Sequence, residues 1–203
     1  MRRIVLAVLF ASLFALAYAL YDQGSHNTTD AVSQGETFIS EKSDGENMMC
    51  TIGYVDKTHR AFYTAAHCTS DGAEALYGSS NKPVGVAKVL SDDRARIDLY
   101  DDVKIGDNTY SGDAIDEPSV GDSVCAWGQT TRRMRCDVIS SVDDNGYILS
   151  GPISAGDLGD SGGPMWTDDG FVATYSGKIT EEPSGIAVNG YGYALDASAR
   201  SRS

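Results

Sequence analysis

Two short segments of the chain carry side chains that could support nucleophilic chemistry. Residues 64–68 read TAAHC and place an imidazole beside a cysteine, while residues 159–164 read GDSGGP and place a hydroxyl among glycines. A serine hydroxyl attacks poorly until an imidazole accepts its proton, and the imidazole needs a carboxylate to fix its tautomer. Alone, the first segment is equally typical of the end of a buried strand, and the second of a glycine-rich turn. Together they predict a nucleophile, Ser161, with His67 as its base.

The elements that must hold these residues in place are short β-strands. Runs of β-branched and aromatic residues alternate with turn sequences such as Ser-Asp-Gly and Asp-Asn-Gly, which favour hairpins. Short strands together with 22 glycines favour an all-β sandwich or barrel. A helix is expected only from Asp196 onward. The strands are expected at residues 48–54, 60–66, 84–90, 96–103, 123–127, 137–142 and 171–175.

The N-terminal segment, residues 1–19, is typical of a secretory signal peptide. Two arginines precede an apolar run that closes with the small-x-small sequence Ala-Tyr-Ala. An uncleaved membrane anchor is the alternative, because the run approaches the lower length limit for crossing a bilayer. Residues 20–43 are polar without sustained periodicity, which predicts a flexible lead-in or a short propeptide. We therefore expect a secreted, extracellular protein.

The charge balance excludes two classes of partner. The chain carries a formal net charge of −13, which becomes −15 if the two N-terminal arginines leave with a signal peptide. So acidic a surface repels nucleic acid and anionic lipid. We expect neither nucleic acid nor, after signal cleavage, a membrane as a partner.

Four cysteines follow the signal segment: Cys50, Cys68, Cys125 and Cys136. An even number in an exported chain predicts disulfides, and four cysteines allow three pairings. The sequential pairing would close two short loops, each adding about 3 kcal/mol of stability through loop entropy. A zinc site is the alternative, but no C-x-x-C pair or nearby histidine supplies the usual ligand spacing. We expect no metal and no cofactor.

The order of the two segments, histidine before serine, resembles the chymotrypsin-like serine proteases. Residues 125–131, CAWGQTT, with Cys136 are similar to the disulfide hairpin of the bacterial branch, the α-lytic protease and streptogrisin group. Residues 175–177, YSG, are similar to the substrate-aligning strand of that group. The resemblance covers residues 48–193. It implies two six-stranded antiparallel β-barrels, expected at residues 44–110 and 111–203, with the active site in the cleft between them.

The resemblance also implies an activity. A protein of this kind is a serine endopeptidase that hydrolyses peptide bonds through an acyl-enzyme intermediate, acts on protein or peptide substrates and is expected to be a monomer. By resemblance, the oxyanion of the reaction is bound by the backbone amides of Gly159 and Ser161. Donors of this kind are each worth roughly 3 to 4 kcal/mol of activation free energy.

The carboxylate partner of His67 must come from a stretch crowded with acids. In the family, the catalytic aspartate is followed two positions later by a small residue and four positions later by an apolar residue of a strand. Residues 93–97, DRARI, fit this pattern, whereas Asp98 would put bulky Tyr100 where the small residue belongs. We therefore predict Asp93 and keep Asp98 as the alternative. The other aspartates of the stretch are interpreted as a solvated edge: Asp92, Asp101 and Asp102.

Asp160, directly before Ser161, needs a partner if it is buried, because an unpaired buried carboxylate is costly. The bacterial group places an arginine immediately after the first hairpin cysteine, but here that position is Ala126. An inserted N-terminus, as in animal relatives, is the alternative, but no basic residue followed by Ile-Val-Gly-Gly occurs. We predict that an arginine of the same hairpin reaches Asp160: Arg132, Arg133 or Arg135.

By resemblance, the substrate pocket is lined by the residues before the nucleophile and by the strand after it. Trypsin-like members bind a basic side chain with an aspartate six residues before the serine, but that position is Ala155 here. Tyr175 is expected to limit the depth of the pocket, which predicts small or medium apolar residues before the scissile bond. Lys178 at the rim is interpreted as facing solvent, and the alternative is that it admits an acidic residue before the scissile bond. The predicted lining residues are Ala155, Gly156, Leu158, Tyr175, Ser176 and Gly177.

Two other functions compete with the peptidase. A catalytically silent binding or regulatory module on the same fold is the main alternative, since fold alone does not set function. Silent relatives commonly lose the serine or the histidine, and this chain retains both. An acidic cell-surface structural protein would leave both segments unexplained.

Overall fold

The computed structural model describes residues 31–142, 146–150, 152–181, 184 and 186–195. Within these ranges the regular structure is β-strand, apart from two 3₁₀ turns, η1 (Ala66–Cys68) and η2 (Pro152–Ala155). The all-β prediction is therefore confirmed. The signal peptide expected at residues 1–19 and the helix expected from Asp196 lie outside the described residues. In the ranges given above, no helix has the length and apolar character needed to cross a bilayer.

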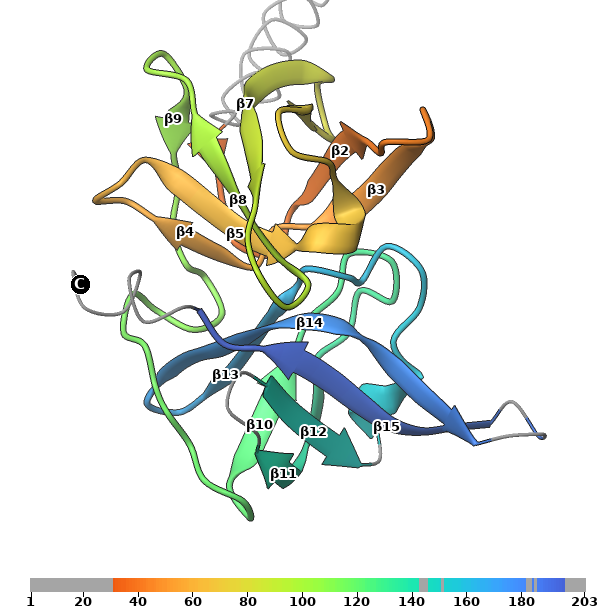
Figure 1. Cartoon of the computed structure of the whole chain (residues 1–203). Helices are drawn as coiled ribbons and strands as arrows, with labels where there is room; N and C mark the ends of the chain where they lie inside the picture. The colour runs from red at the N-terminus through yellow and green to blue at the C-terminus, as the bar shows by residue number, and fades with distance from the viewer. Residues whose placement is uncertain (1–30, 143–145, 151, 182–183, 185, 196–203) are drawn as a thin grey trace, which may run out of the picture. The chain divides into compact units, whose positions relative to one another are not determined.

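Seven strands of the N-terminal half form one antiparallel sheet with the order β3-β2-β6-β7-β8-β5-β4 (Figure 1). The sheet begins with β3 and ends with β4, which are consecutive in the chain. In the connection between β3 and β4, Ile52 N donates to Glu36 O, next to β2, at 2.8 Å, and Gly53 N donates to Tyr63 O on β5 at 2.9 Å. The connection is therefore hydrogen-bonded to β2 on one side and to β5 on the other. β3 and β4 are therefore two halves of one bent strand, and the bend closes the sheet as a six-stranded barrel. The strands are β2 (Thr37–Glu41), β3 (Asn47–Thr51), β4 (Tyr54–Asp56), β5 (Ala61–Ala65), β6 (Glu74–Tyr77), β7 (Lys82–Val89) and β8 (Arg94–Leu99).

The prediction of a flexible lead-in at residues 20–43 is wrong for the last part of that range, because two strands lie between residues 31 and 41. β1 (Ala31–Val32) pairs in parallel with β9 (Lys104–Ile105), and β2 pairs with both β3 and β6. Phe38 on β2 is fully buried, and its ring packs edge-on against Phe62 with centroids 5.2 Å apart. The buried positions of β2 alternate over five residues only, and one of them is Ser40. So short and polar a strand leaves no apolar period in the sequence.

Six strands of the C-terminal half form a closed antiparallel barrel with the order β10-β11-β12-β15-β14-β13. Its core consists of side chains such as Val124, Ile139, Met165 and Val172, which are fully buried or nearly so. Both predicted six-stranded antiparallel barrels are thus present. The strands are β10 (Ser123–Ala126), β11 (Arg135–Val142), β12 (Gly146–Ser150), β13 (Pro164–Thr167), β14 (Gly170–Glu181) and β15 (Ile186–Tyr193).

A buried aromatic cluster joins the two barrels. Tyr54 and Tyr63 of the N-terminal barrel pack with Phe171 and Leu195 of the C-terminal half. The rings of Tyr54 and Phe171 lie 4.9 Å apart between centroids. Apolar burial therefore fixes β4 and β5 against β14, and residues at this junction are held in place by two cores.

Gly53, in the bend that closes the first barrel, also lies at the junction. A Cβ atom there would collide with the carbonyl oxygen of Gly162 and would lie 2.6 Å from Thr174 Cγ2. Only glycine therefore lets the bend approach the loop that carries Ser161 so closely.

The two disulfides follow the sequential pairing. Cys50 on β3 is bonded to Cys68 in η1, and Cys125 on β10 is bonded to Cys136, which lies directly opposite on β11. The first disulfide joins β3 to the turn that contains His67. The second ties the hairpin that contains the three arginines predicted to reach Asp160.

Candidate active site

His67 and Asp93 are joined by two contacts. The η1 turn at the end of β5 brings His67 to the loop between β7 and β8, where Asp93 lies. The amide of His67 donates to Asp93 Oδ1 at 2.8 Å, and His67 Nδ1 lies 2.8 Å from Asp93 Oδ2. Asp93 has a φ of 48°, a left-handed conformation that aspartate adopts more readily than most residues. The loop backbone thereby presents both carboxylate oxygens to the histidine.

The protonation of this pair follows from its hydrogen bonds. Partial burial alone would raise the pKa of Asp93, but the hydrogen bonds from His67 and Ser176 hold that pKa below its ordinary value. An ionised carboxylate only accepts, so the network assigns the imidazole proton to Nδ1 and leaves Nε2 as an acceptor. Asp98, the alternative partner, is half-exposed on β8 and accepts from Arg96 Nη2 at 3.1 Å. The structure joins His67 to Asp93 and not to Asp98.

The Ser161 loop, residues 157–163, is fixed to β3 through its carbonyl groups. Thr51 N donates to Ser161 O at 2.9 Å, and Thr51 Oγ1 donates to Gly159 O at 2.7 Å. Gly162 has a φ of 82°, and a Cβ atom there would collide with Thr64 Oγ1. Since Thr64 is on β5, three residues before His67, the loop is brought to the same end of that strand as the histidine.

In the described structure, the hydrogen-bond donors of this loop that have no protein acceptor are a hydroxyl and two amides. In the described part of the chain, no hydrogen bond joins the Ser161 hydroxyl to His67, and the amides of Gly159 and Ser161 donate to no acceptor. Hydrogen bonds between a nucleophile and its base often form only when substrate is bound. The arrangement thus leaves the hydroxyl and both amides available to a ligand.

Asp160 is fully buried and is surrounded by donors. Arg135 Nη1 donates to Asp160 Oδ2 at 2.7 Å, and the amides of Thr130, Thr131 and Asp157 each donate at 3.0 Å. Burial alone would raise the pKa of Asp160, but these amides and the guanidinium hold it below its ordinary value. The prediction that a hairpin arginine reaches Asp160 is therefore confirmed.

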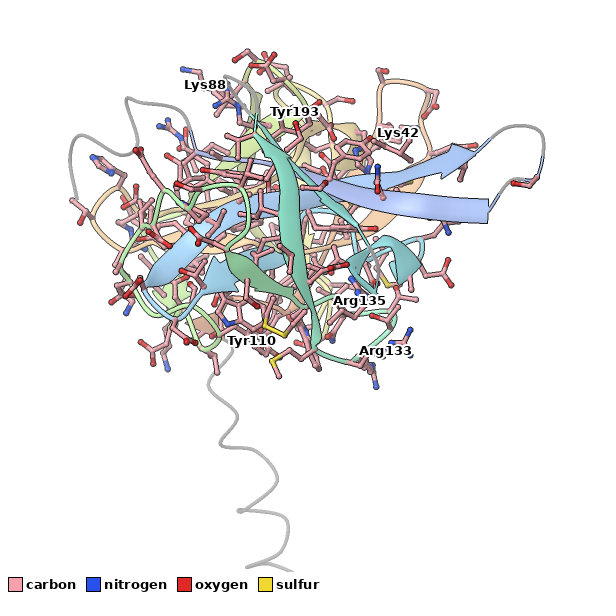
Figure 2. All side chains as sticks on the ribbon, turned by 90° about the horizontal axis from the view of Figure 1, so that it is seen from below. Lys42, Lys88, Tyr110, Arg133, Arg135 and Tyr193 are labelled. Carbon is pink, nitrogen blue, oxygen red and sulfur yellow. A yellow bond between two sulfur atoms is a disulfide. The ribbon has the colours of Figure 1, made fainter. Side chains whose placement is uncertain are left out.

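Of the three candidate arginines, the structure selects Arg135, which is buried, whereas Arg133 points away from the ribbon (Figure 2). Arg132 and Arg133 are exposed. Arg135 lies directly opposite Ala126 in the register of β10 and β11, and cross-strand partners point to the same face of a sheet. The guanidinium therefore reaches Asp160 from the strand across the hairpin from Ala126, where the arginine was expected.

Ser176 contacts Asp93, a role that sequence analysis missed when it assigned this residue to the pocket. The register of β14 against β15 shifts between Tyr175 and Gly177, so Ser176 lies in a β-bulge. A bulge turns a side chain out of the regular alternation of a strand. The buried hydroxyl of Ser176 donates a short hydrogen bond to Asp93 Oδ2, across the junction of the barrels. The only sequence signal for the bulge is Gly177, and glycine within a strand is a weak one.

Comparison with known proteins identifies the fold. No protein-family model matches the sequence. The uncharacterized protein Rv1815 of Mycobacterium tuberculosis is 28% identical over 173 residues, which cover 75% of this chain and 76% of that protein. Cellulomonas bogoriensis chymotrypsin has a TM-score of 0.62 at 19% identity, covering 84% of this chain and 95% of that chain. Thermobifida fusca protease A has a TM-score of 0.60 at 22% identity, covering 84% and 94%. The chain has the chymotrypsin-like double-barrel fold.

On this chymotrypsin-like fold, three of the remaining predicted pocket residues pack against neighbouring side chains and two are exposed. Gly156 and Tyr175 touch, since a Cβ atom on Gly156 would lie 2.7 Å from Tyr175 Cζ. Gly177 packs against an aromatic ring of β15. Ala155 and Leu158 are exposed, Leu158 to 84% of its surface. The structure therefore brings Gly156 and Tyr175 together and leaves Ala155 and Leu158 in solvent.

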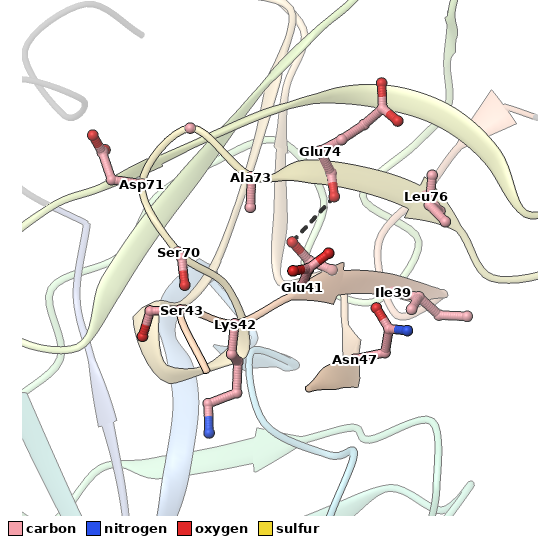
Figure 3. A pocket seen from close by; sticks show the side chains of 12 residues that line it. Ile39, Glu41, Lys42, Ser43, Asn47, Ser70, Asp71, Ala73, Glu74 and Leu76 are labelled. Carbon is pink, nitrogen blue, oxygen red and sulfur yellow. Dashed lines mark hydrogen bonds between the residues drawn. The ribbon is translucent and has the colours of Figure 1, made fainter. Parts of the chain in front are cut away.

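A separate groove of about 470 Å³ lies beside the turn that follows His67 (Figure 3). Three exposed acids, Glu41, Asp71 and Glu74, contribute to its lining. Ser40, the buried residue among the lining residues, is hydrogen-bonded to the Thr69 hydroxyl and to the carbonyl of Glu74. Over the described ranges, no group of three or more His, Cys, Asp or Glu residues could hold a metal ion. We assign the groove no role.

Proposed function

We propose that this protein is a secreted serine endopeptidase in which Ser161 is the nucleophile, His67 the base and Asp93 the carboxylate that orients the base. The proposal depends above all on the double contact between His67 and Asp93, at the end of β5 where the Ser161 loop docks. Similarity of fold would not carry this conclusion alone.

The geometry supports acyl transfer in two steps. Ser161 Oγ attacks the carbonyl carbon of the scissile bond while His67 Nε2 takes the hydroxyl proton. The amides of Gly159 and Ser161 donate to the oxygen as it becomes negative, and ionised Asp93 stabilises the imidazolium. His67 then gives the proton to the leaving amine, the C–N bond breaks and an ester remains on Ser161. Water, deprotonated by His67, attacks this ester, the bond between the acyl carbon and Oγ breaks, the acid product leaves and His67 returns the proton to Ser161 Oγ.

An unpaired strand edge supports a peptide as the substrate. Among the described strands, β13 pairs with β14 only as far as Thr174, so residues 176–181 of β14 pair with β15 alone. An extended peptide adds to such an edge through backbone hydrogen bonds. The edge begins beside Ser176, which contacts Asp93, so a peptide bound there would reach the candidate active site.

Two disulfides support an extracellular location, because such bonds persist in oxidising compartments. A signal peptide at residues 1–19 and secretion after its removal complete the proposal. Sequencing the N-terminus of the protein recovered from culture medium tests this part. A chain that keeps residues 1–19 would contradict it.

Cleavage of a mixed peptide library, read by mass spectrometry, tests the activity. We expect internal peptide bonds to be cut by the wild type and by Ser79→Ala, an exposed serine with no role in the proposal, but not by Ser161→Ala. The alternative is a catalytically silent binding module on the same fold. No cleavage by folded wild-type protein would support that alternative.

A further inference from the structure

Tyr175 fills the space next to the Ser161 loop. Its amide donates to Gly163 O at 2.8 Å and its carbonyl accepts from Gly162 N at 2.6 Å, so its backbone lies directly beside the loop. Its side chain is 2% exposed and belongs to the core of the C-terminal barrel. A Cβ atom on Gly156 would lie 2.7 Å from Tyr175 Cζ and 2.8 Å from Cε1. The hydroxyl end of the ring therefore packs directly on the backbone of Gly156, and the hydroxyl oxygen is the nearest of its atoms.

The face of the ring also has a neighbour. The guanidinium of Arg135 lies over the ring, 5.5 Å from its centroid, within the range of a cation–π contact, and Arg135 is bound to buried Asp160. A ring that tilted toward the guanidinium would displace this ion pair. Burial raises the pKa of Tyr175 to about 12, so the hydroxyl is neutral at physiological pH. Tyr175 is thus an uncharged wall that is in contact with Gly156 at its hydroxyl end and with Arg135 at its face.

The position of this wall matters for a bound substrate. We place the acyl oxygen of a bound peptide at the amides of Gly159 and Ser161 and pair its backbone with β14 from Ser176 onward. In this arrangement we expect the side chain before the scissile bond to point into one gap of the structure. This gap lies between β14 and residues 155–160, which precede Ser161. At Tyr175 and Gly156 the two sides of the gap are in contact.

We propose that Tyr175, closed against Gly156, limits the residue before the scissile bond to glycine, alanine or serine. This inference rests on the proposed peptidase function and names the substrate class of the same site. A leucine or phenylalanine side chain would have to displace the tyrosine ring. In a hydrophobic pocket, one methylene changes kcat/KM by roughly 10- to 200-fold. The preference for alanine over leucine should therefore be at least about tenfold.

The test compares peptides that differ only at this residue: alanine, leucine, phenylalanine, glutamate and arginine. For wild-type protein, kcat/KM should be highest with alanine. Tyr175→Ala should raise kcat/KM for leucine and phenylalanine by at least about tenfold. Tyr175→Phe keeps the ring but loses the hydroxyl that lies nearest Gly156, so it should raise kcat/KM for these peptides by less than Tyr175→Ala does. Tyr147→Ala is the matched control, because Tyr147 is buried in the same core but belongs to β12. It should lower stability without changing the order of the substrates.

The outcomes separate this inference from the proposed function. Cleavage after leucine, phenylalanine, glutamate or arginine in preference to alanine by the wild type would overturn the size limit and leave the peptidase intact. Cleavage of none of the peptides or of the mixed library would overturn both. Where Tyr175→Ala fails to fold, Tyr175→Val replaces it, and the wild-type order alone still decides. An unchanged order in a folded Tyr175 variant without the ring would also contradict the inference.

Discussion

Two histidine–aspartate pairs in the N-terminal half have nearly the same local geometry. In each, the histidine amide donates to one carboxylate oxygen and Nδ1 lies close to the other. The distances are 2.8 and 2.8 Å for His67 with Asp93, and 2.9 and 2.6 Å for His59 with Asp56. The two imidazoles are similarly exposed, at 39% and 33% of their side-chain surface. A carboxylate partner alone therefore does not distinguish a catalytic histidine from a structural one.

The surroundings of the pairs differ. Asp56 and His59 are three residues apart, where β4 turns into β5, so the turn itself closes the pair. His67 and Asp93 are 26 residues apart on two separate connections of the barrel, and Ser176 of the other barrel adds a third hydrogen bond. Local sequence can therefore make a histidine–aspartate pair, whereas the pair at the junction of the two barrels lies at the end of β5, where the Ser161 loop docks.

The largest contrast is expected from removing the charge of each aspartate. Asp93→Asn should reduce kcat by about 10⁴-fold, because an amide in that place favours the wrong imidazole tautomer. Asp56→Asn should leave kcat within about twofold. Peptide hydrolysis by the two purified variants measures both effects. Near-normal turnover in Asp93→Asn, with loss in Asp98→Asn, would transfer the role to Asp98.

An ion pair beside the Ser161 loop and the ion pairs of Lys57, near His59, should differ in how much they stabilise the folded state. Arg135→Ala leaves Asp160 buried without its cation and should lower the free energy of unfolding by about 3 to 5 kcal/mol. Lys57, beside His59, is bound to Asp107 and Asp113 in solvent, so Lys57→Ala should cost at most about 1 kcal/mol. Denaturant unfolding of both variants measures the difference. Equal losses would mean that the Ser161 loop does not depend on its buried pair.

The third hydrogen bond to Asp93 has no counterpart at Asp56. Ser176→Ala should lower kcat by about tenfold, because a hydrogen bond to a charged group contributes roughly 1.5 to 3 kcal/mol and water replaces part of it. KM should change little if Ser176 positions the carboxylate and does not bind substrate. Steady-state kinetics separate the two parameters. A rise in KM at constant kcat would return Ser176 to the pocket.

The smallest effect concerns stability at acid pH. The folded state lowers the pKa of Asp93, so the stability that its hydrogen bonds contribute is fully present above its unfolded pKa, about 4. That contribution is lost as the pH falls through the lower folded pKa. Between pH 5 and 2, the wild type should therefore lose more stability than Asp93→Asn, measured by urea unfolding. Parallel pH curves would contradict the lowered pKa.

Motifs that are local in sequence could be predicted, and contacts across the junction could not. His67, Ser161 and Asp93 lie in short segments with recognisable residue patterns, and the structure shows the contact of His67 with Asp93. The arginine partner of Asp160 followed from the cost of a buried charge, but only the register of β10 and β11 selects Arg135. The strand at Thr37–Glu41 lacks an apolar period, and the place of Ser176 depends on a bulge. The closed contact of Gly156 and Tyr175 depends on how the Ser161 loop docks, which no local pattern records.

Labelling with a fluorophosphonate, followed by peptide mapping, tests most directly whether the barrel junction activates Ser161. We expect the wild type and His59→Ala both to be labelled at Ser161 at similar rates, and His67→Ala not to be labelled. His59 serves as the matched control because its pair with Asp56 has nearly the same geometry away from the Ser161 loop. Folded wild-type protein without label, or label in His67→Ala at the wild-type rate, would mean that His67 does not activate Ser161.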